Sequence, residues 1–211
     1  MKKYAAEFIG TFALVFCGTG AIIIDQQTGG QVGHAGIAAT FGLIVLAMIY
    51  TFGETSGAHF NPAVSIGFWV AGRFEGKKVL PYILSQMGGA LFASGTSRLL
   101  FPTNQLLGTT LPAGSAMQSF VLECILTYFL MLVIINVSQG SKEMGVLAGI
   151  AIGATVLLEA MFAGPICGAS MNPARSLAPA LVSGNLQMLW IYLSAPVLGA
   201  VGATITWRLM K

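Results

Sequence analysis

Residues 56–63 read S-G-A-H-F-N-P-A, and residues 167–174 read C-G-A-S-M-N-P-A. A short apolar run follows each stretch, at residues 64–70 and at residues 176–182. Each run is too short to cross a bilayer but long enough for a half-crossing of about ten residues. Asn is a strong helix N-cap and Pro fits the first helical position, so each Asn-Pro-Ala predicts the start of a short helix.

The composition indicates that lipid is the main solvent of this chain. Of its 211 residues, 55% are hydrophobic and only 8% are charged, whereas a soluble domain carries roughly 25% charged residues. The mean hydropathy is +0.81. These values exclude a soluble enzyme, a nucleic-acid binder and a disordered scaffold. The net charge of +3 comes from too few charges to suggest a nucleic-acid partner, and the three cysteines form no metal-binding or redox motif.

Six apolar segments are long enough to cross a membrane, since one span needs about 20 residues. No cleavable signal peptide is evident, so the first segment is interpreted as a span. The predicted spans are residues 4–24, 34–52, 79–100, 115–137, 144–163 and 187–209.

Charge predicts the orientation of these spans. With six spans, both termini and the second and fourth connections share one side, and that side holds eight of the ten Lys and Arg residues. Only Arg98 and Arg175 lie on the other side. The positive-inside rule therefore predicts that both termini are cytoplasmic.

The two halves of the chain resemble each other beyond the Asn-Pro-Ala boxes. Glu7 and Glu123 each begin an E-x-x-x-T-aromatic motif, 116 positions apart, while Asn61 and Asn172 are 111 positions apart. Each half contains three spans, and an odd number inverts the second copy. We therefore expect an all-α membrane protein forming one domain over residues 1–211. It would hold six transmembrane helices and two re-entrant half-helices, with inverted repeats at about 1–105 and 115–211.

Taken together, these motifs resemble the aquaporin (major intrinsic protein) family over essentially the whole chain. The string at residues 164–176 is most similar to the nodulin-like branch, which passes small solutes, and we interpret the chain as a microbial type. The resemblance implies a passive channel for water and small uncharged solutes, glycerol or metalloid acids among them, that excludes protons and ions. It also implies a homotetramer in a plasma or inner membrane, with a pore in each protomer.

The resemblance implies no enzyme activity, catalytic residue, cofactor, metal or nucleic-acid partner. Two other classes stay open on the sequence alone. Inverted repeats with broken helices also build secondary transporters of small solutes, which normally need a coupling-ion site. A membrane enzyme is the weaker alternative, because no Ser/His/Asp set or nucleotide-binding loop supports it.

The two boxes are the predicted pore motif. Asn amide N–H groups would bind the oxygen of a passing water, and the positive ends of both half-helices would repel cations. The pore residues are Asn61, Pro62, Ala63, Asn172, Pro173 and Ala174.

Arg175 is a cation in the first turn of the second half-helix, where a helix end disfavours positive charge, so it is a functional candidate. The resemblance implies that Phe41, Ala160, Ala169 and Arg175 form a selectivity filter. Strict water channels of the family usually carry His where Ala160 stands, and the nodulin-like branch often has Trp where Phe41 stands. Alternatively, Phe41 and Ala160 are ordinary packing residues.

Two buried carboxyl groups need hydrogen-bond partners. We interpret Glu7 and Glu123 as structural braces for the two re-entrant segments, rather than as proton relays, and expect Glu159 to brace the second box. His59 is predicted to border the vestibule on the side of the termini, either as a wall residue or as a pH gate. His34 is assigned no role.

Overall fold

The structure, a computed structural model, describes residues 1–138 and 142–211, and all the regular structure in them is helical. In each half of the chain, a short helix lies between the second and the third long helix. The helices are α1 (Lys2–Gln27), α2 (Gly33–Ser56), α3 (Pro62–Val70), α4 (Gly76–Leu100), α5 (Ala116–Val137), α6 (Lys142–Cys167), α7 (Pro173–Ser183) and α8 (Leu189–Leu209).

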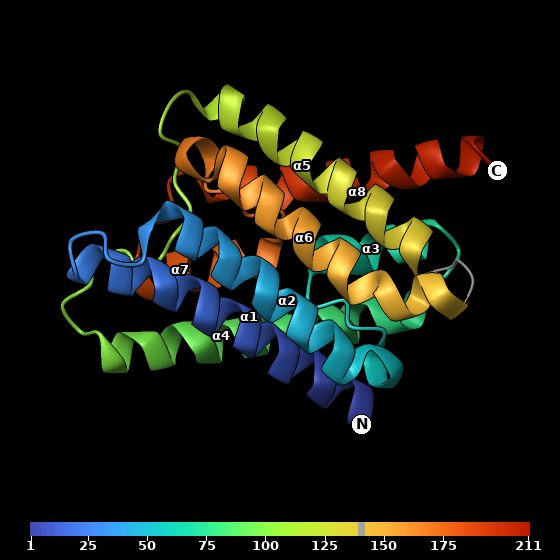
Figure 1. Cartoon of the computed structure of the whole chain (residues 1–211), viewed down its shortest axis with the longest axis horizontal. Helices are drawn as coiled ribbons and strands as arrows, with labels where there is room; N and C mark the ends of the chain where they lie inside the picture. The colour runs from blue at the N-terminus through green and yellow to red at the C-terminus, as the bar shows by residue number, and fades with distance from the viewer. Residues whose placement is uncertain (139–141) are drawn as a thin grey trace.

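The helices form two corresponding halves, α1–α4 and α5–α8. Helix α1 packs on α2 and α4, and α5 packs on α6 and α8 in the same way. Each short helix also packs against the last helix of the other half, α3 on α8 and α7 on α4. In Figure 1 both termini and α3 lie at one end of the bundle, and α7 lies toward the opposite end. The expected fold of six long helices and two half-helices in an inverted repeat is confirmed.

Five of the described helices, namely α1, α2, α5, α6 and α8, are long and apolar enough to cross a membrane. Helix α4 has 25 residues, which is long enough, but it is less apolar. Its polar side chains Gln86, Ser94 and Ser97 are almost fully buried. These three polar side chains of α4 therefore face protein, which explains how a sixth span tolerates them.

The helices before the two half-helices run further than their apolar segments. Helix α2 continues to Ser56 and α6 continues to Cys167, past the predicted ends at residues 52 and 163. Both end where a glycine takes a left-handed conformation, Gly57 at φ 85° and Gly168 at φ 84°. Backbone hydrogen bonding continues until such a residue stops it, whereas hydropathy marks only where the side chains turn polar.

Glycines permit the closest helix contacts in both halves. A Cβ atom on Gly89 of α4 would lie 2.1 Å from the carbonyl oxygen of Phe8, and one on Gly199 of α8 would lie 2.2 Å from that of Cys124. No side chain fits at those distances. These two glycines thus allow close packing at equivalent places in the α1–α4 and α5–α8 contacts.

Candidate functional site

Both half-helices begin at the residue that the sequence predicts. The side-chain oxygen of Asn61 accepts the N–H of Ala63 at 2.9 Å, and that of Asn172 accepts the N–H of Ala174 at 3.0 Å. The proline after each Asn takes the first helical position, where its missing N–H is not needed. The two Asn-Pro-Ala boxes are therefore N-caps of helices α3 and α7.

The side-chain amides of the two Asn residues also join the halves. Asn61 Nδ2 donates to the carbonyl oxygen of Met171 at 2.7 Å, and Asn172 Nδ2 donates to that of Phe60 at 2.9 Å. Each amide group has two N–H bonds, so one remains for a solute. Sequence reasoning left both free, because it did not predict how close the two loops approach. Asn61 and Asn172 both line a large cavity.

The loops before the two half-helices hold an uncommon backbone conformation. Ala58 and Phe60 have φ values of 51° and 49°, and Ala169 and Met171 have φ values of 39° and 53°. Left-handed backbone costs a non-glycine residue roughly 1–2 kcal/mol. Four such residues in equivalent places need support from the surrounding structure.

Two buried carboxylates supply that support. Glu7 of α1 accepts the N–H groups of His59 at 3.0 Å and Phe60 at 2.7 Å. Glu123 of α5 accepts those of Ser170 at 2.7 Å and Met171 at 2.8 Å. The structure thus places Glu7 and Glu123 against the two re-entrant loops, where the sequence interpretation expected them.

The first half adds partners that sequence reasoning missed. Glu7 also accepts the hydroxyl of Ser56 at 2.7 Å and the side-chain N–H of Gln86 at 2.8 Å. Cys167 stands at the place of Ser56 in the second half, and its thiol donates to the carbonyl of Ala163 at 3.5 Å. Pro196 lies four residues after Tyr192, as Gln86 lies four residues after Tyr82, and it has no side-chain donor. The two carboxylates are therefore braced unequally.

Paired tyrosines fix the helix ends before both loops. The hydroxyl of Tyr82 donates to the carbonyl of Ser56, and that of Tyr192 donates to the carbonyl of Cys167, each at 2.8 Å. Their place in α4 and α8 gave no sequence signal, because their partners are backbone groups that become available only at a helix end.

Glu159 does not brace the second box. Its Oε2 atom is buried without a hydrogen-bond partner among the described residues. Within the same residues, the Glu159 side chain makes no hydrogen bond to the loop before α7. The backbone N–H groups of Ser170 and Met171 instead donate to Glu123.

Two cavities meet at the predicted filter residues. The large cavity, of about 820 Å³, runs past both Asn-Pro-Ala boxes, and a small cavity of about 450 Å³ lies beyond it. Among the described residues, four line both cavities: Phe41, Ala160, Ala169 and Arg175. These four were singled out from the sequence, and the structure gathers them from α2, α6, the second loop and α7.

Arg175 is held in the wall between the cavities. The side chain is only 2% exposed, and its Nη1 atom donates to the carbonyl of Gly108 at 2.8 Å. Its guanidinium carbon lies 5.1 Å from the centre of the Phe41 ring. The Nε atom has no partner among the described residues. The Gly108 carbonyl offsets the unfavourable position of a cation at a helix N-terminus, and unused donors remain.

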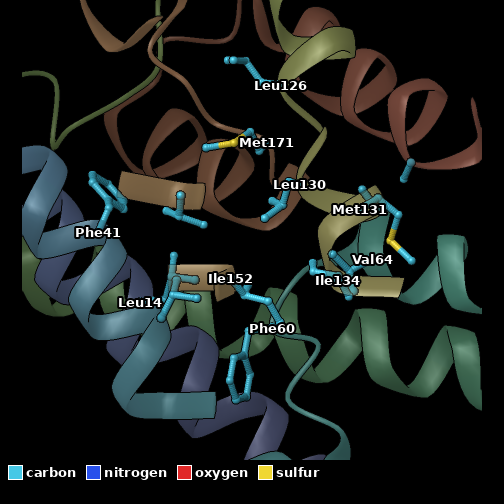
Figure 2. Packing of buried hydrophobic residues seen from close by; sticks show 14 of the residues in the cluster. Leu14, Phe41, Phe60, Val64, Leu126, Leu130, Met131, Ile134, Ile152 and Met171 are labelled. Atoms are coloured by element: carbon cyan, nitrogen blue, oxygen red, sulfur yellow. The ribbon is translucent and has the colours of Figure 1, made fainter. Parts of the chain in front are cut away.

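Apolar side chains form much of the large cavity. Leu14, Leu130, Ile134 and Ile152 line it and belong to the buried hydrophobic cluster. Figure 2 shows these side chains together with Phe60 of the first loop and Met171 of the second loop. The cavity thus combines an apolar wall with polar groups from the two boxes.

His59 lies in that cavity on the side of α3. Its Nδ1 atom is 3.0 Å from the hydroxyl oxygen of Ser65, and its ring stacks on Phe68 at a centroid distance of 4.8 Å. Phe74 and Tyr82 lie against the same imidazole. This packing holds the imidazole in one orientation.

Comparisons with known proteins agree with this architecture. The family model described as "Major intrinsic protein" matches residues 1–207. The chain is 47% identical to "Aquaporin NIP1-1" of Zea mays, over 100% of this chain and 75% of that protein. It is 44% identical to "Nodulin-26" of Glycine max, over 100% of this chain and 78% of that protein.

A solved structure shares the fold. The "X-ray structure of the aquaglyceroporin from Plasmodium falciparum" superposes with a TM-score of 0.89 at 28% identity, covering 98% of this chain and 94% of that one. The resemblance inferred from the motifs is confirmed, since family model and relatives cover nearly the whole chain. The chain belongs to the major intrinsic protein family.

Proposed function

We propose that the chain is a passive channel for water and small uncharged solutes. One observation carries the proposal: Phe41, Ala160, Ala169 and Arg175 line both cavities, so a solute that passes between the cavities passes these four side chains. The similarity to an aquaporin of Zea mays and to an aquaglyceroporin of Plasmodium falciparum supports the same function.

The two boxes would orient water and reject cations. Asn61 and Asn172 each keep one amide N–H after their cross-bonds, and these donors would bind the oxygen of a passing water. The N-termini of α3 and α7 add about +0.5 charge each near the same place. Neutral solutes pass such a field, whereas hydronium and metal cations are repelled.

The four shared residues would act as the selectivity filter. Arg175 offers donors on one side, and Phe41 offers an aromatic surface against it. Ala160 contributes only a methyl group, which leaves the passage wider than an imidazole would. Glycerol, with hydroxyls on one face and carbon on the other, suits this asymmetry, and small metalloid acids are of similar size.

We further propose that the chain assembles as a homotetramer in a plasma or inner membrane. Large apolar side chains such as Leu43, Phe92, Leu99, Phe129 and Phe162 are exposed on the single chain. Lipid and neighbouring subunits of a homotetramer would cover them. The charge asymmetry supports a plasma or inner membrane with both termini cytoplasmic. A channel of this kind needs no cofactor, metal or catalytic residue.

Reconstitution into liposomes tests the proposal. We expect the protein to accelerate osmotic water flow and glycerol entry, with fluxes proportional to the gradient, while a pH-sensitive dye reports no added proton leak. A proton conductance similar to that of gramicidin would overturn ion exclusion. Saturable uptake driven by an ion gradient would identify a secondary transporter instead.

A further inference from the structure

Helix α6 contains an unusual acceptor close to the filter. Pro165 has no N–H, so the carbonyl of Met161, four residues earlier, lacks its normal helical donor. His34 Nε2 lies 2.7 Å from that carbonyl oxygen. A carbonyl can only accept, so Nε2 is the donor. The imidazole of α2 thus takes the place of the missing backbone N–H of α6.

The residue before the proline makes room for this contact. A Cβ atom on Gly164 would lie 2.9 Å from His34 Cε1, closer than a side chain tolerates. Gly164 therefore admits the imidazole, and Pro165 frees the oxygen that it binds. Two adjacent residues of α6 therefore make the contact with His34 possible.

This contact lies beside the filter. His34, Gly164 and Pro165 line the small cavity together with Phe41 and Ala160. Met161 directly follows Ala160, and Phe41 follows His34 by about two helical turns, on the same face of α2. The bond thus joins the segments of α2 and α6 that carry two of the four shared residues.

The rest of the α2–α6 contact is fixed independently. A Cβ atom on Gly42 would lie 2.6 Å from the carbonyl of Gly153, so the helix backbones touch near their middle. Further toward the other end, the hydroxyl of Tyr50 donates to the carbonyl of Val146 at 2.8 Å. Among the described residues, the His34 bond is the one hydrogen bond that joins α2 to α6 on the filter side of the glycine contact.

We propose that His34 is a positioning residue for the selectivity filter. By donating to the Met161 carbonyl, His34 fixes the wall that carries Ala160 against the wall that carries Phe41. This inference rests on the proposed function, because it requires Phe41 and Ala160 to border the path of the solute. Without the donor, the freed carbonyl takes a water molecule, the end of α6 moves away, and the passage widens.

The test compares erythritol and glycerol fluxes in the same liposomes. Net loss of one hydrogen bond is worth about 0.5–1.5 kcal/mol, so we expect His34→Leu to raise the erythritol-to-glycerol flux ratio roughly two- to tenfold. His34→Gln places an amide N–H near the position of Nε2 and should keep the wild-type ratio. Tyr50→Phe removes the hydrogen bond to the Val146 carbonyl, which lies away from the filter, and should also keep the wild-type flux ratio.

A second substitution separates positioning from packing. Pro165→Ala restores a backbone N–H to the Met161 carbonyl, so His34→Leu should have no effect on the flux ratio in a Pro165→Ala protein. A histidine that merely fills space would matter equally in both backgrounds, and that result would overturn the proposal. If His34→Leu does not fold, Gly164→Ala, which displaces the imidazole, must raise the ratio instead.

Ala160→His in the same assay separates the filter role of Ala160 from the positioning role of His34. If Ala160→His alters the flux ratio and folded His34→Leu does not, the positioning role is wrong and the filter stands. If neither variant alters it, the filter assignment is wrong and the positioning role falls with it.

Discussion

Glu7 and Glu123 occupy equivalent places, but the Glu7 carboxylate accepts two side-chain hydrogen bonds in addition to the two backbone bonds that both accept. Ser56 and Gln86 provide the difference. The loop before α3 is therefore held by a larger polar network than the loop before α7, although each loop holds two non-glycine residues with positive φ.

Because Glu7 accepts more hydrogen bonds than Glu123, removing the Glu7 carboxylate should reduce stability more. Each buried donor that loses its partner costs about 1–3 kcal/mol, and Glu7→Ala leaves more such donors than Glu123→Ala. We expect both variants to unfold at lower temperature than wild type, with Glu7→Ala the less stable. Thermal unfolding in detergent measures this, and the glycerol-to-water flux ratio of the folded fraction should not change. A stable variant with altered selectivity would refute the brace assignment.

The cross-bonds of Asn61 and Asn172 predict energetic coupling between the boxes. Both bonds join the same two loops, so losing one loosens the other. In a double-mutant cycle, Asn61→Ala with Asn172→Ala should destabilise by about 0.5–3 kcal/mol less than the two single changes added together. Unfolding by titration with SDS gives the free energies. Thr28→Ala, exposed at the end of α1, is the matched partner that should combine additively with Asn61→Ala.

Ala160→His should convert the channel toward water selectivity. An imidazole added at a position that lines both cavities narrows the passage, so glycerol flux should fall sharply while water flux stays close to wild type. Stopped-flow light scattering measures both. Ala154→His, exposed on the same helix, is the control and should change neither flux. An unchanged ratio in a well-folded Ala160→His protein would show that Ala160 does not border the path.

Arg175 should account for much of the barrier to cations at the filter. Arg175→Val removes a buried positive charge from the wall between the cavities, so we expect a measurable sodium or proton leak. Arg175→Lys retains the charge and should leak less, although a lysine ammonium cannot present a planar guanidinium to both Gly108 and Phe41. Ion flux in liposomes at fixed membrane potential compares them, and equal leaks would contradict a role for the charge.

The repeated motif explains why so much of the fold could be predicted. Asn, Pro and a short apolar run carry local information about where a helix begins and how far it reaches, and their recurrence at Asn172 predicts the second half-helix. Helix ends were less predictable. Hydropathy ended the second span at Phe52, whereas backbone hydrogen bonds continue to Ser56 until Gly57 stops them.

Two unpredicted parts of the site are contacts between a side chain and a distant backbone carbonyl. Tyr192 binds the carbonyl of Cys167, and His34 binds that of Met161. Pro165 indicates in the sequence that one carbonyl of α6 is free, but not which residue reaches it. The donor is 127 positions away in sequence and is identified only when α2 and α6 are packed together.

Val64 and Arg175 stand at the same place in the two halves, each three residues after its Asn. The duplicated scaffold therefore carries a charge in the wall between the two cavities, and an isopropyl group in the wall of the large cavity at the corresponding point of the first half. A neutral solute at equal concentrations still crosses equally fast both ways, since no energy source is coupled to its movement. A membrane-impermeant carboxylate is different. Added on the side of Arg175, it would bind there and block flux in both directions. Added on the side of Val64, it would meet no charge at the corresponding point and leave flux unchanged. Blockade of this protein should thus be one-sided while its permeability is not.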